Sequence, residues 1–385
     1  MVLALLCLVL AYLVAERIRH EQRLKRIPIR IHVNGTRGKS SVTRLIAAAL
    51  RRSGIRTLAK TTGDLPKLVL PDGSDQAIRR WSPANILEQM RVIKLADKLS
   101  AQAVVIECMA LEPSLQLVSE SEMIRSTVGV ITNVRPDHFE VMGKSLDDIA
   151  EALSGTIPEN GVLITADSRH YSFFSEVASK RGSRAVLAGN YGTCAEDLPE
   201  DARCFRENIE LAQSVCCLFD ISPEVVEECL DGSGFDEEGA KAHQIPVGDA
   251  MIYFLDAFAA NDIESTRIFQ DRVLAHGVCP RPWIALFNHR VDRPLRMKSF
   301  ADGLLAGSSY DRIVVTGQGC RLAYRYLRGR IPEKEIVFLP YTSPDKFLNE
   351  LLRYTAGKDC TVVGMGNGKG AGGDISRLMR QRRAQ

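Results

Sequence analysis

The chain has 385 residues, of which 45% are hydrophobic and 25% are charged, and its formal net charge is +3. This length exceeds one compact core and predicts two domains of an ordinary globular protein. The small net charge, without a long basic run, argues against a nucleic-acid-binding protein. The cysteines form no C-x-x-C pair, so we expect reduced thiols in a cytosolic body and no zinc site.

The N-terminal segment differs from the rest of the chain. An unbroken apolar stretch, Val2–Ala15, is followed by a cationic stretch, Glu16–Arg26. As a helix the apolar part would span about 21 Å, which is less than the roughly 30 Å of a bilayer core. We expect residues 1–27 to form a short single-pass anchor in the inner, cytoplasmic membrane, with the basic flank and the catalytic body in the cytoplasm. An amphipathic helix docked on the core is the alternative.

The next segment predicts a phosphate-binding loop between a strand and a helix. Ile29–Val33 alternates as a buried strand does, and Ser41–Arg52 carries apolar residues at helical spacing. A strand, a glycine-containing turn and a helix start are the context in which a G-K-S motif binds phosphate. The residues expected to contact the nucleotide are Asn34, Gly35, Thr36, Arg37, Gly38, Lys39, Ser40 and Ser41.

Each residue type in this loop suits a triphosphate. Gly35 and Gly38 would let backbone amides approach phosphate oxygens, and the helix N-terminus adds its dipole. Lys39 would reach the outer phosphates and Ser40 would bind magnesium. The first glycine of the standard spacing would fall at Val33, so a chance match is the alternative interpretation.

Two later strands are expected to end at the same site. Ala103–Cys108 predicts a buried parallel strand with Glu107 at its C-terminal end, and Val128–Asn133 leads toward Asp137 and His138. The carboxyl ends of neighbouring strands form the binding crevice of an α/β sheet. Glu107 is therefore a candidate magnesium ligand, with an edge salt bridge as the alternative. Asp137 and His138 are expected within reach of the nucleotide and the metal.

Alternating strand and helix patterns continue through both halves of the chain and predict parallel sheets. The glycine- and acid-rich segment Asp231–Gly239 marks the boundary between residues 28–235 and 236–385. Further helices are expected at Ser82–Leu99, Leu146–Leu153, Asn208–Leu218, from Pro223, and at Thr266–Ala275, Phe300–Leu305, Pro344–Leu352 and Asp374–Arg383. Further strands are expected at Gly161–Thr165, Met251–Leu255, Trp283–Asn288, Arg312–Thr316, Glu335–Leu339 and Cys360–Gly364. A substrate contact and a simple turn both fit the glycine cluster Gly364–Gly370.

Taken in order, these motifs resemble the Mur ligase superfamily of ATP-dependent amide-bond ligases. Within it the chain looks like the ligase subunits of poly-γ-glutamate synthases, which make a capsule polymer. The blocks that carry this narrower resemblance are Lys60–Gly63, Glu107–Ala110, Asp137–Gly143, Thr156–Gly161, Phe258–Asp262 and Arg290–Arg293. The resemblance covers nearly the whole chain. It implies an α/β fold with a central P-loop ATPase domain, a C-terminal Rossmann-like ligase domain and a short N-terminal membrane helix.

The resemblance also implies a reaction. ATP would phosphorylate a terminal carboxylate, and the amine of glutamate would attack the acyl phosphate, releasing phosphate and lengthening a poly-γ-glutamate chain. Lys39 would then offset charge on the transferred phosphoryl group, while Ser40 and Glu107 would hold Mg²⁺. His138 would take a second-metal or substrate-side role.

Further contacts follow from the same resemblance. Asn208 stands where relatives place an asparagine near the base, and Asp256 stands where they place a ribose-binding aspartate. The implied substrate contacts are Lys60, Thr61, Asn261, Arg290 and Arg293. Glutamate and the polymer are the implied substrates, and small membrane subunits of a synthase complex are the implied partners.

The sequence departs from the family pattern at three places. Ala152–Ser154 stands where many relatives carry a carbamylated lysine, Phe258 replaces a lysine, and Ala242–Gln244 replaces an arginine. A nucleotide-binding structural subunit that has lost ligase chemistry is therefore one alternative function. A soluble relative that joins glutamate to folate or to a wall precursor is another, against which the apolar N-terminus argues.

Overall fold

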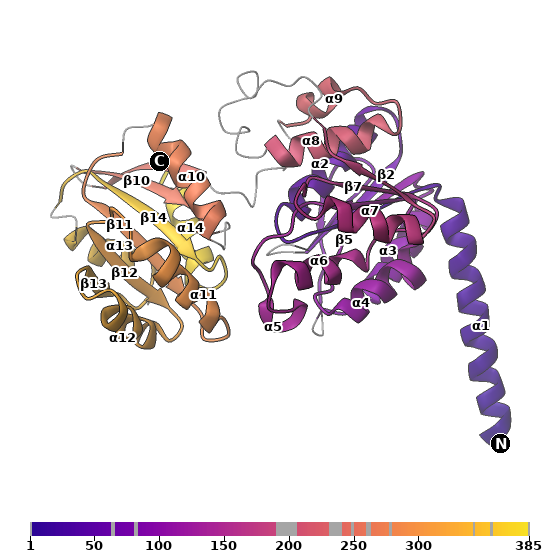
Figure 1. Ribbon diagram of the computed structural model, residues 1–385, viewed down its shortest axis with the longest axis horizontal. Helices are drawn as coiled ribbons and strands as arrows, with labels where there is room; N and C mark the ends of the chain where they lie inside the picture. The colour runs from indigo at the N-terminus through magenta and orange to yellow at the C-terminus, as the bar shows by residue number, and fades with distance from the viewer. Residues whose placement is uncertain are drawn as a thin grey trace. The chain divides into compact units, whose positions relative to one another are not determined.

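The computed structural model describes residues 2–62, 66–80, 84–189, 206–230, 241–247, 250–258, 263–276, 279–341, 343–354 and 357–383. The chain divides into two compact units, Met1–Asp236 and Glu237–Gln385 (Figure 1). Each unit contains its own β-sheet. The predicted boundary segment, residues 231–239, lies outside the described residues.

The sheet of the first unit has eight strands in the order β4-β3-β2-β5-β1-β6-β7-β8. Its parallel strands are β1 (Ile29–Asn34), β2 (Thr57–Thr61), β5 (Ala103–Glu107), β6 (Val128–Ile131), β7 (Val162–Thr165) and β8 (Arg184–Leu187). Two short strands, β3 (Lys67–Val69) and β4 (Asp75–Ala77), form an antiparallel extension at one edge. The central strands β2, β5 and β6 are buried throughout, as strands covered on both faces are.

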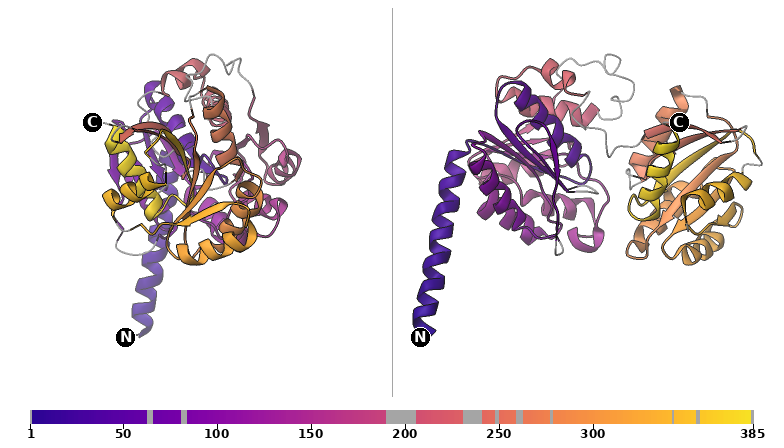
Figure 2. Two further views of the ribbon diagram at one scale, coloured as in Figure 1. Left: turned by 90° about the vertical axis from the view of Figure 1, so that its left-hand side faces the viewer. Right: turned by 180° about the vertical axis from the view of Figure 1, so that it is seen from behind.

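Helices cover both faces of this sheet (Figure 2). On one face α2 (Lys39–Arg52), α8 (Arg206–Cys217) and α9 (Pro223–Glu228) enclose a large apolar core. The helices that contribute to the remaining cores or border them are α3 (Glu88–Lys98), α4 (Pro113–Val118) with a π-helical continuation (Ser119–Ile124), α5 (Phe139–Met142), α6 (Leu146–Ser154) and α7 (Tyr171–Lys180). The parallel arrangement brings the carboxyl ends of β1, β2, β5 and β6 to one edge, where the predicted site lies.

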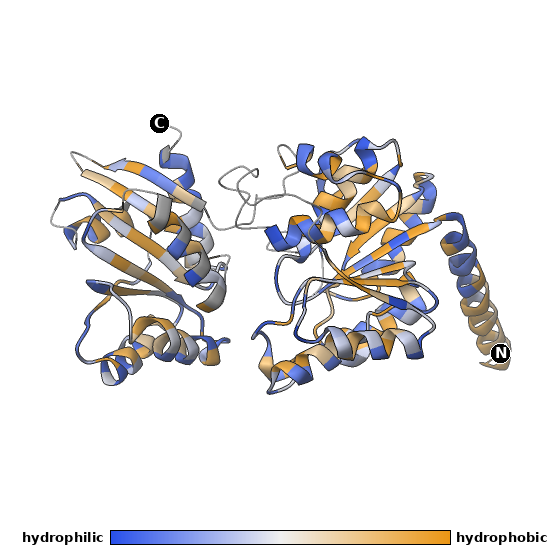
Figure 3. Cartoon of the chain, turned by 45° about the horizontal axis from the view of Figure 1, so that its top comes forward, coloured by the Kyte–Doolittle hydropathy of each residue, from blue (hydrophilic) through white to orange (hydrophobic). Residues whose placement is uncertain are grey.

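Helix α1 (Val2–Arg26) is one continuous helix with two different halves (Figure 3). The apolar residues of its first half are exposed, whereas Leu24 is buried and His20 Nε2 lies 2.8 Å from the carbonyl oxygen of Met123. Within the described residues, no helix is both long enough and apolar enough to cross a bilayer. The prediction of a single-pass anchor is therefore not supported. The apolar stretch stops at Glu16, and the charged turns that follow pack on the first unit.

The second unit has a six-stranded sheet in the order β13-β12-β11-β14-β10-β9. Its strands are β9 (Lys241–Val247), β10 (Ala250–Asp256), β11 (Trp283–His289), β12 (Arg312–Gly317), β13 (Glu335–Phe338) and β14 (Cys360–Gly366), of which only β9 pairs antiparallel among those described. Its helices are α10 (Ile263–His276), α11 (Pro294–Phe300) with a π-helical continuation (Ala301–Leu305), α12 (Cys320–Arg330), α13 (Pro344–Arg353) and α14 (Ala371–Arg383).

Two of the predicted helix boundaries differ most from the structure. The helix predicted over Ser82–Leu99 begins at Glu88, because the side chain of Asn85 accepts the backbone N–H of Leu87 and forms a turn before the helix. Ser82 itself lies outside the described residues. The segment Phe300–Leu305 is the end of a longer helical run that starts at Pro294, where proline suits the first helical turn.

Candidate active site

The loop between β1 and α2 has a backbone that requires its two glycines. Gly35 and Gly38 have φ angles of 125° and 78°, a region that L-residues with a side chain rarely adopt. Each is also tightly packed, because a Cβ would lie 2.0 Å from Thr132 Oγ1 at Gly35 and 2.4 Å from Asn208 Oδ1 at Gly38. The loop is therefore a fixed structure at the carboxyl edge of the sheet.

Residues at the end of the neighbouring strand β6 hold the loop in place. The backbone N–H of Thr36 donates to the carbonyl oxygen of Asn133 at 3.1 Å, and the N–H of Arg37 donates to Asn133 Oδ1 at 3.0 Å. Thr132 Oγ1 donates to the carbonyl of Arg37 at 2.6 Å. No side chain caps the N-terminus of the 14-residue helix α2 among the described residues. Its first amides are therefore left to bind an anion.

Lys39 lies over this loop. Its Nζ atom donates to the carbonyl oxygens of Gly35 at 2.7 Å and Thr36 at 3.4 Å. The acceptors in these hydrogen bonds are neutral carbonyls, and anionic phosphate oxygens would form stronger bonds with the ammonium group. Lys39 is thus positioned to move from loop carbonyls to a triphosphate.

The next residue, Ser40, contacts the carboxylate that ends β5. Ser40 Oγ donates to Glu107 Oε2 at 2.8 Å, and the backbone N–H of Thr62 donates to the same oxygen at 2.7 Å. Strand register places Glu107 opposite Val33, directly before the loop. The hydroxyl and the carboxylate are hard oxygen donors of the kind that a small divalent cation takes.

These two donors are too few to enclose a cation. Within the described residues, no group of three or more His, Cys, Asp and Glu side chains is arranged to hold a metal ion. Mg²⁺ commonly binds with one or two protein ligands, several waters and substrate phosphates. Ser40 and Glu107 fit that mode of binding rather than an all-protein site.

A second charged group lies beside the loop. Arg37 Nη1 is 3.5 Å from Asp137 Oδ2, and the same carboxylate oxygen is 3.7 Å from His138 Nε2. His138 Nδ1 is 3.7 Å from Glu140 Oε1, and His138 has a left-handed φ of 47° before α5. Asp137 therefore links the predicted residue His138 to the phosphate-binding loop.

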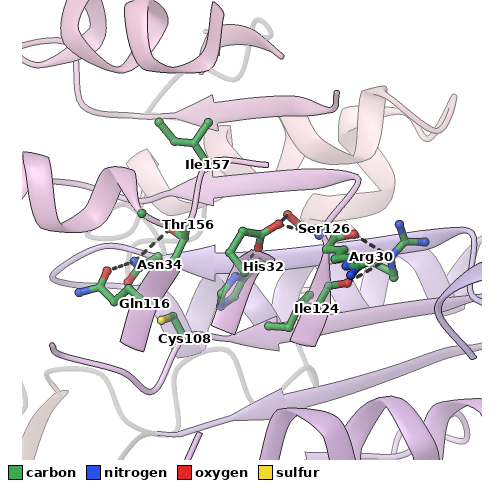
Figure 4. Close-up of polar contacts among 12 residues, drawn as sticks. Arg30, His32, Asn34, Cys108, Gln116, Ile124, Ser126, Thr156 and Ile157 are labelled. Carbon is green, nitrogen blue, oxygen red and sulfur yellow. Dashed lines mark hydrogen bonds and ion pairs between the residues drawn. The ribbon is translucent and has the colours of Figure 1, made fainter. Parts of the chain in front are cut away.

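Polar side chains at alternate positions of β1 form hydrogen bonds in the strand that leads into the loop (Figure 4). Asn34 Nδ2 donates to Gln116 Oε1 at 2.7 Å and to Thr156 Oγ1 at 3.1 Å. Two residues earlier, His32 Nδ1 lies 2.7 Å from Glu120 Oε2. Gln116 and Glu120 were not predicted, because no local pattern links them to β1. The only local signal is the polar residues at alternate positions of a strand that is otherwise apolar.

The remaining predicted residues of the first unit differ in exposure. Asn208, on α8, packs against Gly38 of the loop. Lys60 is fully buried, and its Nζ atom contacts Gln89 Oε1 at 2.9 Å and Glu88 Oε2 at 3.4 Å. Burial is the main reason why the pKa of Lys60 is lowered. Thr61 is buried as well. In this conformation the side chains of Lys60 and Thr61 are therefore part of the protein interior and present no surface to a substrate.

The predicted residues of the second unit lie around its own sheet. Asp256 ends β10, where Ser376 Oγ donates to its Oδ1 at 2.9 Å and Arg380 is 3.9 Å from its Oδ2. Arg290 pairs with Asp292 at 2.6 Å, and Arg293 stands immediately before α11. Asn261 lies outside the described residues.

Comparisons with protein families place both halves of the chain. Residues 33–215 match the Mur ligase middle domain, and residues 242–382 match the poly-gamma-glutamate synthase CapB C-terminal domain. The capsule biosynthesis protein CapB of Bacillus anthracis is 34% identical over 364 residues, covering 94% of this chain and 78% of the relative. The PGA synthase CapB of Bacillus subtilis (strain 168) is 32% identical over 362 residues, covering 93% and 92%.

Solved structures show the same architecture. A bifunctional folylpolyglutamate synthase/dihydrofolate synthase with Mn, AMPPNP and L-glutamate bound superposes with a TM-score of 0.63. It is 14% identical, and the match covers 95% of this chain and 92% of that one. At this identity the likeness establishes the Mur ligase-like α/β fold.

Proposed function

The chain belongs to the family of CapB poly-γ-glutamate synthases and is an ATP-dependent amide ligase, and we propose that it adds glutamate to a growing poly-γ-glutamate chain. One observation carries the proposal for the site. The hydroxyl of Ser40 and the carboxylate of Glu107 are hydrogen-bonded at 2.8 Å, beside a glycine loop that ends at an uncapped helix N-terminus. This arrangement suits a metal-bound triphosphate.

The reaction has two steps. An oxygen of the terminal carboxylate attacks the γ-phosphorus of ATP, ADP leaves, and an acyl phosphate forms. The amine of glutamate then attacks the acyl carbon, phosphate leaves, the nitrogen loses a proton, and an amide is formed. Such catalysis consists mainly of positioning and charge stabilisation.

The residues of the first unit divide this task. The N-terminal amides of α2 bind phosphate oxygens, and Lys39 leaves the carbonyls of Gly35 and Thr36 to follow the transferred phosphoryl group. Ser40 and Glu107 would hold a divalent cation, Mg²⁺ in our proposal, which neutralises phosphate charge when bound. Structural neighbours of the fold include a protein solved with Mn and AMPPNP, which supports a divalent cation and ATP.

We assign the other predicted residues to substrate-side roles. Asp137, held by Arg37, orients His138 toward the space beside the loop. Asn208 would stand near the nucleotide base, since it packs on the loop at Gly38. In the second unit, Asp256 would bind the ribose, and Arg290 and Arg293 would contact glutamate carboxylates.

We also propose that the protein works at the cytoplasmic membrane with small membrane subunits. Membership of a capsule-synthesis family supports this. The exposed apolar half of α1 does so as well, because large exposed apolar surfaces mark protein or membrane contacts. Removal of residues 2–15 should shift the protein from the membrane fraction to the soluble fraction. An unchanged distribution would contradict this part of the proposal.

The enzymatic proposal is tested by product release from purified protein. We expect ADP and phosphate only when ATP, a divalent cation, glutamate and a γ-glutamyl acceptor are all present. Glu107→Gln should lower this rate by roughly 100-fold or more, because it removes a charge that a metal-bound triphosphate needs. Glu112→Gln, at an exposed position before α4, is the matched control and should behave as wild type.

Two results would overturn the proposal. Full activity of Glu107→Gln would show that the site is elsewhere. Turnover with a folate or wall-precursor acceptor, and none with γ-glutamyl chains, would assign the chain to a different ligase reaction.

A further inference from the structure

A cavity lies beside the candidate active site, between the β3–β4 hairpin and α3. Thr61, at the end of β2, pairs with Lys67 at the start of β3, and Lys67 pairs with Ala77 at the end of β4. The chain after Ala77 therefore returns to the carboxyl edge of the sheet. Helix α3 begins at the same edge with Glu88, so the two walls meet near the end of β2.

The cavity has a volume of about 370 Å³, within the range of small-molecule sites. Its walls combine apolar side chains, such as Leu68 and Val92, with the guanidinium groups of Arg79, Arg80 and Arg91. A second hollow of about 670 Å³ shares Leu68 and Arg79 with the first and continues along the hairpin. The surface is therefore elongated, partly apolar and rich in cations.

The acid that lines the cavity pairs with only one of the three arginines. Glu88 lines the cavity, but it is hydrogen-bonded to Arg80 at 2.6 Å and lies 3.4 Å from Lys60. Burial raises the pKa of Glu88, yet Arg80 and Lys60 lower it below its ordinary value, so its charge is committed to them. In the described part of the chain, the guanidinium groups of Arg79 and Arg91 have no hydrogen-bond or ion-pair partner.

The carboxylate that lines the second hollow is also paired with cations of the protein. Asp75 pairs with Arg44 at 2.8 Å and with Lys67 at 3.0 Å. The charge that remains over both hollows is therefore that of Arg79 and Arg91. A ligand that uses this surface must supply anions.

A buried network joins the cavity wall to the candidate metal carboxylate. Lys60 Nζ contacts both Glu88 of the wall and Gln89 Oε1, and Gln89 Nε2 lies 3.4 Å from the carbonyl oxygen of Glu107. Glu107 in turn accepts the hydroxyl of Ser40. Buried contacts thus connect the lining of the cavity to the carboxylate beside the phosphate-binding loop.

We propose that this cavity binds the acceptor polymer, an inference that rests on the proposed function. A γ-linked glutamate chain repeats two methylene groups and one free carboxylate, so it is both apolar and anionic. Its carboxylates bind Arg79 and Arg91, its methylene groups lie on the apolar wall, and its terminal carboxylate points toward Ser40 and Glu107. An elongated surface fits a linear polymer better than a compact acceptor.

The test is a double variant, Arg79→Ala with Arg91→Ala. The matched control is Lys94→Ala with Lys98→Ala, which removes the same charge from exposed positions of α3 outside the cavity lining. Binding of fluorescently labelled poly-γ-glutamate is measured by anisotropy, and the KM for acceptor is measured from ADP release. Two exposed carboxylate–arginine pairs predict a roughly five- to tenfold weaker Kd and higher KM for long acceptors.

Further readouts separate a binding role from a loss of folding. The KM for ATP and the thermal midpoint should not change in the double variant, and the effect should shrink for a γ-glutamyl dipeptide. Replacing both arginines by lysine should restore much of the affinity, because lysine keeps the charge. Added salt should weaken polymer binding to wild type more than to the alanine variant.

Each outcome decides the matter. Polymer affinity that is unchanged in the Arg79→Ala, Arg91→Ala variant overturns the acceptor site. An equal loss of affinity in the Lys94→Ala, Lys98→Ala control overturns it as well. Wild-type protein that binds the polymer but releases no ADP with glutamate contradicts the proposed function instead. If the wild type turns over γ-glutamyl acceptors and the alanine variant does so with the same KM for acceptor, the proposed function stands and only this site is overturned.

Discussion

The two units contain glycine loops built in the same way. In the first, Gly35–Gly38 joins β1 to α2 and is held by Asn133, which follows the neighbouring strand β6. In the second, Gly366–Gly370 joins β14 to α14 and is held by Asn288 of the neighbouring strand β11. In both cases an asparagine side chain bonds backbone atoms of the adjacent loop.

The side chains around the two loops differ. The first loop has Lys39 over its carbonyls and Ser40 bonded to a buried carboxylate. In the second loop the side chain of Asn367 is buried, and its Oδ1 accepts a hydrogen bond from Arg296 Nη1 at 2.6 Å, while Lys369 is exposed. An asparagine-held glycine loop is therefore a structural solution common to both sheets. The chemistry depends on what the neighbouring strands and the helix start place beside it.

The largest expected difference between the loops is in catalysis. Lys39→Ala should lower kcat/KM for ATP by roughly 10²- to 10³-fold, because it removes a cation placed to follow the phosphoryl group. Lys369→Ala, at the corresponding glycine loop of the second unit, should change it by no more than about threefold. Equal losses, measured by steady-state ADP release, would show that both loops bind the triphosphate.

A smaller difference is expected when the glycines themselves are replaced. Gly38 and Gly370 have similar φ angles of 78° and 70°, but a Cβ meets Asn208 at Gly38 and nothing within 4 Å at Gly370. Gly370→Ala should therefore lower the free energy of unfolding by only about 1–2 kcal/mol, which is the strain of a left-handed backbone in a residue with a Cβ. Gly38→Ala should cost more, on the order of 3 kcal/mol, since strain adds to the clash. Urea unfolding measures both, and equal costs would mean that Asn208 moves freely away from the loop.

Much of the first loop was predictable because its signals are local. The strand Ile29–Asn34, the glycines and the helix up to Arg52 follow one another in sequence, and each has a pattern of its own. The β5 strand that ends at Glu107 was predictable for the same reason, as a short apolar run ending in a carboxylate.

The missed parts depend on contacts between distant segments. Strand β2 was not predicted, because Lys60 interrupts its apolar run, and its burial requires Gln89 and Glu88 from α3. The β3–β4 hairpin consists of three-residue strands, too short for a periodic pattern. Gln116 lies 82 positions from Asn34, so their hydrogen bond has no local signal.

A further expected difference concerns the strands that lead into the two loops. At its centre β14 carries buried apolar residues, whereas β1 carries His32 paired with Glu120. Burial alone would lower the pKa of His32, but Cys108 and Glu120 raise it from 6.5 to about 9. Between pH 6.5 and about pH 9, His32 therefore keeps its proton in the folded protein and loses it in the unfolded chain. The resulting stability is complete below pH 6.5 and is lost as the pH rises through 9.

The free energy of unfolding should therefore fall from pH 6.5 to pH 9, by on the order of 1 kcal/mol per pKa unit. His32→Asn should flatten this slope, because asparagine has no proton to lose, while Glu120 still accepts the N–H of Ser126. Burial raises the pKa of the Cys216 and Cys360 thiols above their ordinary 9.0, so their contributions change only at higher pH. An equal slope in wild type and variant would show that His32 is neutral beneath the loop.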